Sequence, residues 1–360
     1  MAVLFLILWA GQYASPSTIR TTPGYFWSYL AIAFAVLILI PETFLAVGHL
    51  IALIVCRVTA SHRHGQTIRL ASIILSGGVF LSILFALIPG KNQLEVRLVT
   101  IPIKKLPPQL VHLKIVQLSD LHLASFHSRH FLKKCREVIN KLEPDLIVFT
   151  GDMVNNYAGE MDPFNDELRS LHAPLGKYAI LGNHDYGDYS DWKSHSAKIK
   201  NHLQLLRQLR KDGFRVLQNE SVKINYRATS FYLCGTENWG EKPFPQYGNL
   251  TQTLQRLPRN AFSILLTHDP SFWSDKIAGR ESVALTLSGH THGGQLGFKF
   301  AGIEFSPMVF IERYWGGLYM FRNQYLYVNR GLGTVGFHGR LDMPAEITVL
   351  QLISKTTKLN

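Results

Sequence analysis

The stretch ALTLSGHTHGGQ at residues 284–295 decides the fold, because an apolar run leads without a break into closely spaced polar residues. Ala284–Leu287 has the length and composition of a buried strand, and the glycines and histidines begin where that strand would end. Side chains two positions apart in an extended segment share a face, so His290 and His292 can converge on one point. We interpret the pair as metal ligands at the carboxyl end of a strand.

Four other apolar runs end in the same way, and open α/β sheets place their functional groups at such carboxyl ends. KIVQLS leads into Asp120-Leu121-His122, LIVFT into Gly151-Asp152, YAIL into Gly182-Asn183-His184-Asp185, and SILLT into His268-Asp269. Any one block could be a helix cap, a turn or a buried histidine, but local structure does not explain all five together. The seven candidate ligands are Asp120, His122, Asp152, Asn183, His268, His290 and His292.

The chemistry of this set points to two metal ions. Carboxylate, amide and imidazole groups without a thiolate suit Mn²⁺, Fe or Zn²⁺ better than a structural cysteine site does. Seven ligands exceed the need of one ion, but they fill two adjacent sites if one carboxylate bridges. Two metals about 3.5–4 Å apart activate water and clamp a phosphoryl group. The sequence therefore predicts phosphoryl chemistry.

From residue 110 onward, short apolar runs alternate with helical patterns. A strand–helix–strand order opens this part and strands dominate its second half, which predicts an α/β layered sandwich. The expected strands are Leu113–Ser119, Leu146–Thr150, Tyr178–Leu181, Phe214–Leu217, Phe231–Cys234, Ser263–Thr267, Ala284–Leu287, Tyr325–Val328 and Ile347–Leu352. The expected helices are Phe131–Leu142, Asn165–Leu171, Asp191–Leu209 and Leu250–Leu257.

The average composition conceals two parts of the chain that differ in their content of charged residues. The hydrophobic share of 47% is ordinary, yet only five charged residues occur among the first 90, against 57 in the remaining 270. This split excludes a disordered protein and a wholly soluble one. We expect a membrane region at residues 1–90, a juxtamembrane connector with a lead-in strand at 91–109, and a catalytic domain at 110–355.

Four membrane helices are expected in the first 90 residues. Leu70–Pro89 is uncharged over a length of about 30 Å, which matches one bilayer core. Tyr25–Cys56 is too long for one untilted crossing, so Pro41-Glu42 is interpreted as the turn of a helical hairpin, with a single tilted helix as the alternative. The opening MAVLFLILWAGQYA lacks the basic start of a signal peptide and is interpreted as a short first span or an interfacial segment.

The net charge of +12 does not indicate a nucleic-acid partner. Basic residues are scattered instead of forming one arginine-rich stripe, and they fit anionic lipid headgroups or a phosphate-bearing substrate better. Arg57, Arg63 and Arg69 lie in the loop before the last span, and the positive-inside rule favours a cytoplasmic loop and an extracytoplasmic domain. Lys104 and Lys105 after that span weaken this signal. Three cysteines do not form a disulfide framework.

The ordered set D-x-H, G-D, G-N-H-D, a lone H and G-H-T-H resembles the calcineurin-like metallophosphoesterases. The resemblance covers roughly Leu110 to Ile353 and implies a four-layer αββα sandwich. The ending G-H-T-H-G-G-Q, together with the membrane region, is similar to a membrane-anchored bacterial branch. Some members of that branch cleave phosphodiester or pyrophosphate bonds in lipid precursors.

The resemblance also implies roles for the residues at the matching positions. It places Asp120, His122, Asp152 and His292 on one metal, and Asp152, Asn183, His268 and His290 on the other. Asp152 would bridge the metals, a bridging hydroxide would be the nucleophile, and His184 would contact the phosphate and protonate or stabilise the leaving oxygen. One departure is Asn155, because the phosphoprotein phosphatases continue the G-D block to an Asp and an Arg. This argues against a protein phosphatase and leaves the protonation state of His184 open.

The favoured function is therefore a membrane-tethered phosphohydrolase with a dinuclear metal centre, acting on a phosphodiester or pyrophosphate in a lipid-linked or membrane-proximal substrate. It would sit in a bacterial inner or plasma membrane as a multi-pass protein. One alternative is a non-catalytic metal-binding membrane receptor or scaffold, and another is a cytoplasm-facing nucleotide-lipid pyrophosphatase. Residues Pro307–Phe321 are rich in aromatic and apolar groups and form either a lipid-facing lip or a buried loop.

Overall fold

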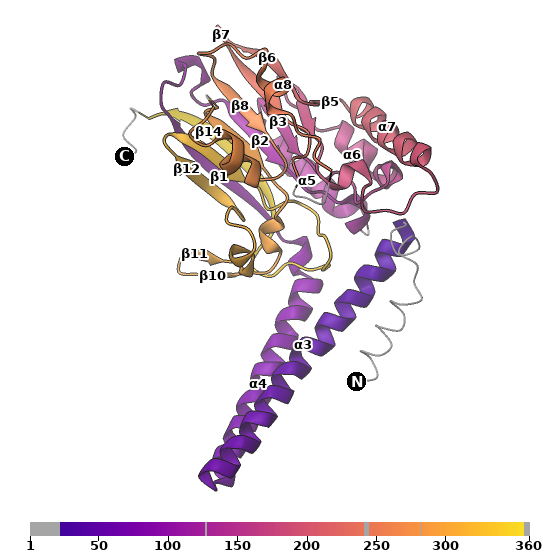
Figure 1. Ribbon diagram of the computed structural model, residues 1–360, viewed down its shortest axis with the longest axis vertical. Coiled ribbons are helices and arrows are strands. Elements are labelled where there is room, and N and C mark those ends of the chain that lie inside the picture. The colour runs from indigo at the N-terminus through magenta and orange to yellow at the C-terminus, as the bar shows by residue number, and fades with distance from the viewer. Residues whose placement is uncertain (1–21, 127, 241–244, 282, 356–360) are drawn as a thin grey trace.

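Two six-stranded sheets pack face to face, and a pair of long helices extends from one end of this sandwich (Figure 1). The computed structural model describes residues 22–126, 128–240, 245–281 and 283–355. The predicted mixed α/β fold with an apolar helical region in front of it is confirmed.

The first sheet has the strand order β1-β14-β2-β3-β4-β5. β2, β3, β4 and β5 run parallel, so their carboxyl ends lie at one edge, while β14 is antiparallel to β2 and parallel to β1. The bounds are β1 (Leu94–Ile103), β2 (Lys114–Leu118), β3 (Leu146–Thr150), β4 (Lys177–Ile180), β5 (Phe214–Val216) and β14 (Ala345–Ser354). The stretch 91–109, expected to be a connector, thus contributes an edge strand to the sheet.

The second sheet has the order β12-β13-β9-β8-β7-β6, in which β7, β8, β9 and β13 run parallel. A separate antiparallel hairpin, β10–β11, follows β9. The bounds are β6 (Glu220–Tyr226), β7 (Thr229–Gly235), β8 (Ser263–Leu266), β9 (Leu285–Ser288), β10 (Phe298–Phe300), β11 (Ile303–Phe305), β12 (Gly317–Phe321) and β13 (Gln324–Val328). Each of the nine strands expected from the sequence is present, with ends shifted by one or two residues at most sites.

The core lies between the two sheets. Buried apolar side chains of the first sheet, such as Ile115 and Val148, share one cluster with Leu233 and Leu285 of the second. Helices cover the outer faces, which gives the predicted helix–sheet–sheet–helix layering. The first sheet is covered by α5 (Arg129–Lys141), α6 (Asn165–Arg169) and α7 (His195–Lys211), and the second by α8 (Leu250–Leu254) and a π-helical turn at Trp273–Ile277.

The helix pair consists of α3 (Thr22–Thr59) and α4 (His62–Leu87), both long and apolar enough to cross a membrane. α3 continues through Pro41, so the predicted hairpin at Pro41-Glu42 is wrong and the single-helix alternative holds. Inside hydrocarbon a turn would leave several backbone groups unpaired, whereas a proline removes one hydrogen bond. Residues 22–87 therefore contain two helices instead of the three expected, and the predicted first span lies outside the described residues.

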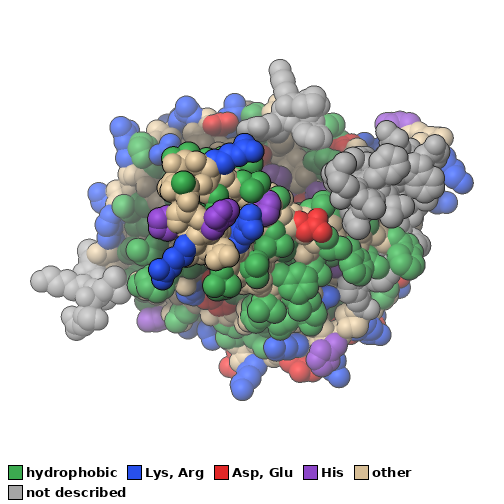
Figure 2. Space-filling model, turned by 90° about the horizontal axis from the view of Figure 1, so that it is seen from below, with side chains coloured by type: hydrophobic (Ala, Val, Ile, Leu, Met, Phe, Trp, Pro, Cys, Tyr) green, Lys and Arg blue, Asp and Glu red, His purple; other side chains and the backbone are tan. Residues whose placement is uncertain are grey.

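Small residues bring the two helices into contact over the half that is remote from the sandwich. A Cβ atom added to Gly48 would lie 2.2 Å from Cβ of Ser72, and Ala52 is fully buried. Toward the sandwich the helices diverge (Figure 1). Seen from the free end, arginine and histidine side chains gather at the tip of the pair, and apolar side chains occupy much of the surface behind it (Figure 2).

Replacement of Gly48 by leucine is expected to destabilise the helix pair by about 1–3 kcal/mol, the usual cost of overpacking a close contact. The matched control is Gly77→Leu on α4, because a Cβ at Gly77 meets no atom within 4 Å. Thermal unfolding of the full chain in detergent measures both variants. Equal midpoints for the two variants would show that the close contact at Gly48 does not stabilise the pair.

Candidate metal centre

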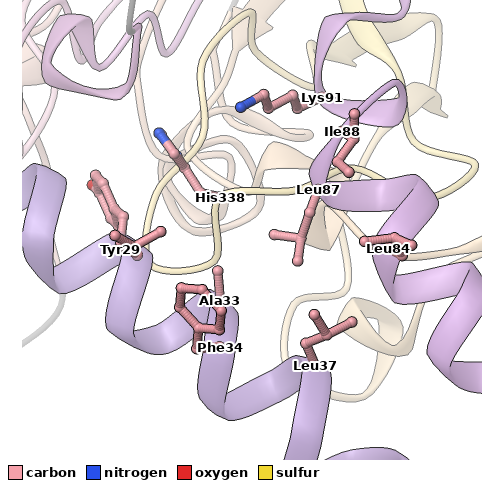
Figure 3. Close-up of a pocket in the computed structure, with 10 residues that line it drawn as sticks. Tyr29, Ala33, Phe34, Leu37, Leu84, Leu87, Ile88, Lys91 and His338 are labelled. Atoms are coloured by element: carbon pink, nitrogen blue, oxygen red, sulfur yellow. The ribbon is translucent and has the colours of Figure 1, made fainter.

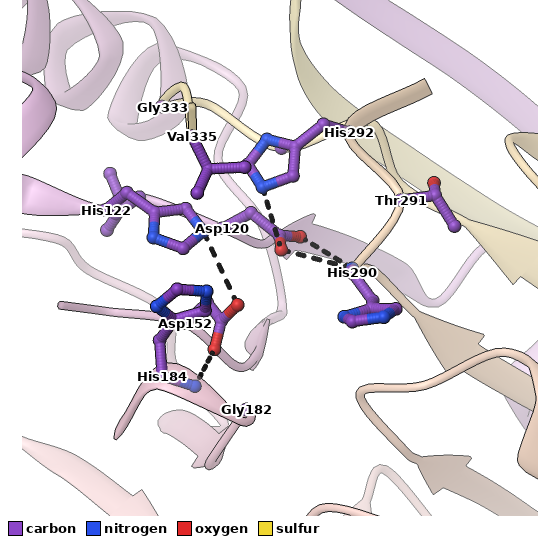
Figure 4. A network of polar contacts seen from close by, with 12 residues as sticks. Asp120, His122, Asp152, Gly182, His184, His290, Thr291, His292, Gly333 and Val335 are labelled. Carbon is purple, nitrogen blue, oxygen red and sulfur yellow. Dashed lines mark hydrogen bonds and ion pairs between the residues drawn. The ribbon is translucent and has the colours of Figure 1, made fainter. Parts of the chain in front are cut away.

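The carboxyl ends of five strands from both sheets meet at one edge of the sandwich and bring all seven predicted ligands together with His184. Figure 4 shows Asp120, His122, Asp152, His184, His290 and His292 in this arrangement. The residues form three groups, and within each group the ligand atoms all lie within 4.8 Å of one another. These groups are Asp120 with His122 and His292, Asp152 with His268 and His290, and His122 with Asp152 and His184.

Asp152 lies between the two outer groups. Its Oδ2 atom is 3.4 Å from Nε2 of His122 and 3.1 Å from Nε2 of His268. Its Oδ1 atom accepts a hydrogen bond of 2.9 Å from the backbone N–H of His184. A carboxylate in this position can serve a cation on either side.

The first group contains buried imidazole nitrogens whose only neighbours are other candidate ligands. Both ring nitrogens of His122 and of His292 are buried without a hydrogen bond within the described residues. Nε2 of His292 lies 3.5 Å from Oδ1 of Asp120, and the two imidazole centroids are 4.9 Å apart. Buried polar atoms without partners cost about 1–3 kcal/mol each, and a divalent cation would satisfy them. The residues present therefore fit a metal site.

The second group is oriented by a backbone contact. Nδ1 of His268 donates to the carbonyl oxygen of Thr150 at 2.7 Å, which turns Nε2 toward Oδ1 of Asn183, 3.0 Å away. Nδ1 of His290 lies 3.2 Å from both of these atoms. Metal-binding histidines commonly use their second nitrogen in this way, because the outer hydrogen bond fixes the tautomer and the ring orientation.

Backbone strain is concentrated at the candidate ligands. Five of them adopt left-handed backbone conformations that cost non-glycine residues about 1–3 kcal/mol each. The φ angles are 51° at Asp120, 43° at His122, 61° at Asp152, 75° at His290 and 53° at His292. Gly182 is needed beside them, since a Cβ there would lie 2.2 Å from Oδ1 of Asp152. Strain of this kind persists only where the surrounding structure holds it, as at a preorganised site.

The electrostatics of the site favour bound cations. Burial alone would raise the pKa of Asp152, but the neighbouring His268 and His184 hold it well below its ordinary value. Burial would likewise lower the pKa of His268, whereas Asp152 raises it to about 10. The buried negative charge is thus balanced by imidazole protons, which metal ions displace when they bind.

His184 is held by a backbone carbonyl instead of a carboxylate. Its Nδ1 donates to the carbonyl oxygen of Asn155 at 2.8 Å, and its ring stacks on Tyr189. Burial lowers the pKa of His184 to about 4, so the ring is neutral at pH 7. The Asn155 side chain points elsewhere and donates to the Tyr29 hydroxyl of α3 at 2.7 Å. The membrane helix therefore contacts the loop that orients His184.

Two functional residues were missed by the sequence reasoning. Asp185 is fully buried and accepts hydrogen bonds from the backbone N–H groups of Asp152, Val154 and Gly182 at 2.9–3.1 Å. Asp185 is the last residue of the G-N-H-D block, so its place in that block could have identified it from the sequence. Arg340 donates to the carbonyls of the loop from Arg330 to Gly333, which packs against Asp120. No local pattern marks Arg340, because its partners are backbone atoms.

Residues 113–294 match the family described as calcineurin-like phosphoesterase. The chain belongs to that family. It is 36% identical to the metallophosphoesterase YkuE of Bacillus subtilis over 248 residues, which cover 67% of this chain and 79% of YkuE. It is 31% identical to the UDP-2,3-diacylglucosamine pyrophosphatase LpxG of Chlamydia trachomatis, over 63% of this chain and 81% of LpxG.

A third relative is the transmembrane protein with metallophosphoesterase domain of Danio rerio, 29% identical over 71% of this chain. The chain spans 56% of that protein's length. Calcineurin-like phosphoesterases are hydrolases that act on phosphoric ester bonds and use a dinuclear divalent metal centre. The predicted family and enzyme class are therefore confirmed.

Replacing Asp152 with asparagine is expected to remove at least half of the bound metal and to lower turnover by about 10²-fold or more, since the charge shared by both groups is lost. Metal content per chain and hydrolysis of bis-p-nitrophenyl phosphate measure the two effects. Asp275→Asn is the control, because Asp275 is exposed and remote from the cluster. Unchanged metal content in Asp152→Asn would contradict a central role for this carboxylate.

Proposed function

We propose that this protein is a membrane-tethered phosphohydrolase that cleaves a phosphodiester or pyrophosphate bond in a lipid-linked substrate. The observation that carries the proposal is the cavity beside the metal cluster, which is lined by candidate ligands and by apolar side chains that continue into an exposed apolar surface. The metal ions are Mn, Fe or Zn, the ions that this mixed donor set suits.

The ligand roles implied by the resemblance agree with the position of Asp152 between the two outer groups. Asp120, His122, Asp152 and His292 would hold one cation, and Asp152, Asn183, His268 and His290 would hold the other. When bound, the metal pair supplies an activated water and neutralises phosphoryl charge.

His184 works at its Nε2 atom, because Nδ1 is engaged by the Asn155 carbonyl. The neutral ring accepts a proton more readily beside a phosphate anion, which favours the charged imidazole and raises its pKa. In that state Nε2 can donate to the leaving oxygen.

The cavity has a volume of about 270 Å³, and its walls differ in chemistry. Asn183 and His290 of the metal cluster line it together with the apolar side chains of Met308 and Ile311. The other lining residues are Tyr189, Asn238, Gly240, Asp269 and Glu312. A phosphate ester with an apolar substituent matches this combination. LpxG, one relative, is by name a pyrophosphatase of a diacylated sugar nucleotide, which is a substrate of the proposed class.

The apolar wall continues into a surface that faces away from the domain. The sequence left two interpretations of Pro307–Phe321, a lipid-facing lip and a buried loop. The lip agrees better with the structure, since Phe310 and Ile311 are each 82% exposed. Phe298, Phe300 and Ile303 of the neighbouring β10–β11 hairpin are also exposed. This hairpin lies at the same end of the sandwich as α4 (Figure 1). Exposed apolar side chains beside membrane helices are suited to the lipid interface.

Ion pairs hold the hairpin against the sandwich. Glu304 of β11 contacts Arg97 of β1 and Arg330 after β13. Burial would raise the pKa of Glu304, but Arg330 and Arg97 lower it to about 2. These ion pairs therefore hold the hairpin, with its exposed apolar side chains, in a fixed position on the sandwich.

Wild-type protein is expected to convert a component of a membrane-lipid extract that Asp152→Asn leaves intact, as read by mass spectrometry. The double variant Phe300→Ser/Phe310→Ser, at two exposed positions that do not line the cavity, should raise KM for that lipid about tenfold, because two apolar contacts are lost, with unchanged turnover of bis-p-nitrophenyl phosphate. Leu203→Ser, an exposed position on α7, is the control. Absence of turnover of any phosphate ester with any metal would favour the metal-binding receptor or scaffold.

We also propose that the catalytic domain is extracytoplasmic. The tip between α3 and α4 carries Arg57 and Arg63, and the domain lies at the opposite end of the pair (Figure 1). In a Cys56→Ser background, Lys104→Cys should react with a membrane-impermeant maleimide in intact cells, and Ala60→Cys at the tip should not. The reverse pattern would place the domain in the cytoplasm and favour a nucleotide-linked lipid substrate.

A further inference from the structure

A second cavity lies between α3 and α4 where the helices diverge, directly beneath the sandwich (Figure 3). Its volume is about 350 Å³. The side walls are apolar and come from both helices, and the end nearest the sandwich carries Tyr29, Lys91 and His338. The apolar lining is Leu30, Ala33, Phe34, Leu37, Leu84, Leu87 and Ile88.

The cavity cannot close by approach of the helices, because each is attached to the sandwich at a different point. Tyr29 of α3 stacks on His338 with ring centroids 4.5 Å apart and accepts the Asn155 hydrogen bond. At the end of α4, the backbone N–H of Arg340 donates to the Ala86 carbonyl at 3.1 Å. Below the cavity, Ser76 of α4 donates a hydrogen bond of 2.9 Å to the Pro41 carbonyl of α3.

The polar end of this cavity continues into a smaller one of about 150 Å³, which shares Lys91 and His338 with it. The polar side chains of Asn92, Ser125, Ser128 and Thr334 line the smaller cavity, together with Phe126, Phe131, Leu332 and Gly333. Lys91 forms no ion pair with a carboxylate in the part of the chain that the structure describes. The two cavities together present an apolar slot followed by a polar compartment with an available cation.

We propose that this joint cavity binds a bilayer lipid, with one acyl chain in the slot between α3 and α4 and an anionic phosphate headgroup beside Lys91. An apolar space within the membrane span has no partners for water, so acyl chains are the molecules that fill it. The cation at its rim complements a phosphate. The ligand is a lipid of the bilayer and not the substrate, because the joint cavity shares no lining residue with the cavity at the metal cluster.

The position of this lipid connects the membrane to the catalytic loops. Ser125 in the polar compartment donates its backbone N–H to the His122 carbonyl, and Gly333 donates to the Asp120 carbonyl. Tyr29, which forms part of the wall, holds Asn155, and the carbonyl of Asn155 orients His184. An occupied cavity supports these loops from the side opposite the metal cluster. The proposal does not depend on the identity of the substrate.

The test uses the full chain in phosphatidylcholine nanodiscs that contain a small amount of phosphatidylglycerol with a diazirine at the end of one acyl chain. Cross-links mapped by mass spectrometry are expected in residues 29–37 and 84–91, in excess over residues 50–58, whose side chains are largely exposed to lipid. Ala33→Trp fills the slot and should lower this labelling about tenfold or more. Ala31→Trp, an exposed position on the same helix, is the matched control and should retain it.

The headgroup is tested by comparing phosphatidylglycerol and phosphatidylcholine probes. Lys91→Gln should reduce the preference for phosphatidylglycerol about fivefold. This ratio corresponds to about 1 kcal/mol for one cation at an anionic surface. The exposed control Lys104→Gln should leave the preference unchanged. Uniform wild-type labelling of all exposed helix positions, or equal labelling by both probes, overturns the proposal. Cleavage of the probe by wild type but not by Asp152→Asn would assign the cavity to the substrate. Specific labelling without phosphohydrolase activity would leave the lipid site standing and remove the proposed function.

Discussion

The packing of two apolar sheet faces against each other is the constraint on which the metal centre depends. Ile115 and Val148 of the first sheet share a buried cluster with Leu233 and Leu285 of the second. Because the central strands of each sheet are parallel, this packing brings their carboxyl ends to one edge of the sandwich. The ligands of the first group come from both sheets, and so do those of the second. A site of this composition exists only while the two sheets keep their relative position.

The strained loops at those strand ends require support from outside the ligand set. Left-handed conformations at five candidate ligands oppose folding, and groups that contact no ligand atom offset that cost. Asp185 fixes the loops after β3 and β4 by accepting three backbone hydrogen bonds. Arg340 fixes the loop after β13 through carbonyl oxygens. Metal binding adds to this support, since cations satisfy the buried imidazoles of His122 and His292.

The helix pair α3–α4 is part of the site's architecture. Asn155 links α3 to the site through two contacts. Its carbonyl orients His184 and its side chain binds Tyr29 of α3. A change in the position of α3 relative to the sandwich would therefore act on the loop that carries Asn155. The exposed hairpin β10–β11 lies at the same end of the sandwich as these helices.

The sequence by itself determined nine of the strands in the described residues and the identity of the residues that meet at one edge of the sandwich, and the resemblance implied the four layers. The strands and the site are detectable in the sequence because short apolar runs are followed directly by polar residues. Only the tertiary structure decided that α3 runs through Pro41, that β1 joins the sheet, and that Arg340 and Tyr29 support the site. The physical reason is that each of these features depends on partners distant in sequence, which neighbouring residues do not specify. A proline within an apolar helix, an edge strand and a hydrogen bond to a backbone carbonyl are all of this kind.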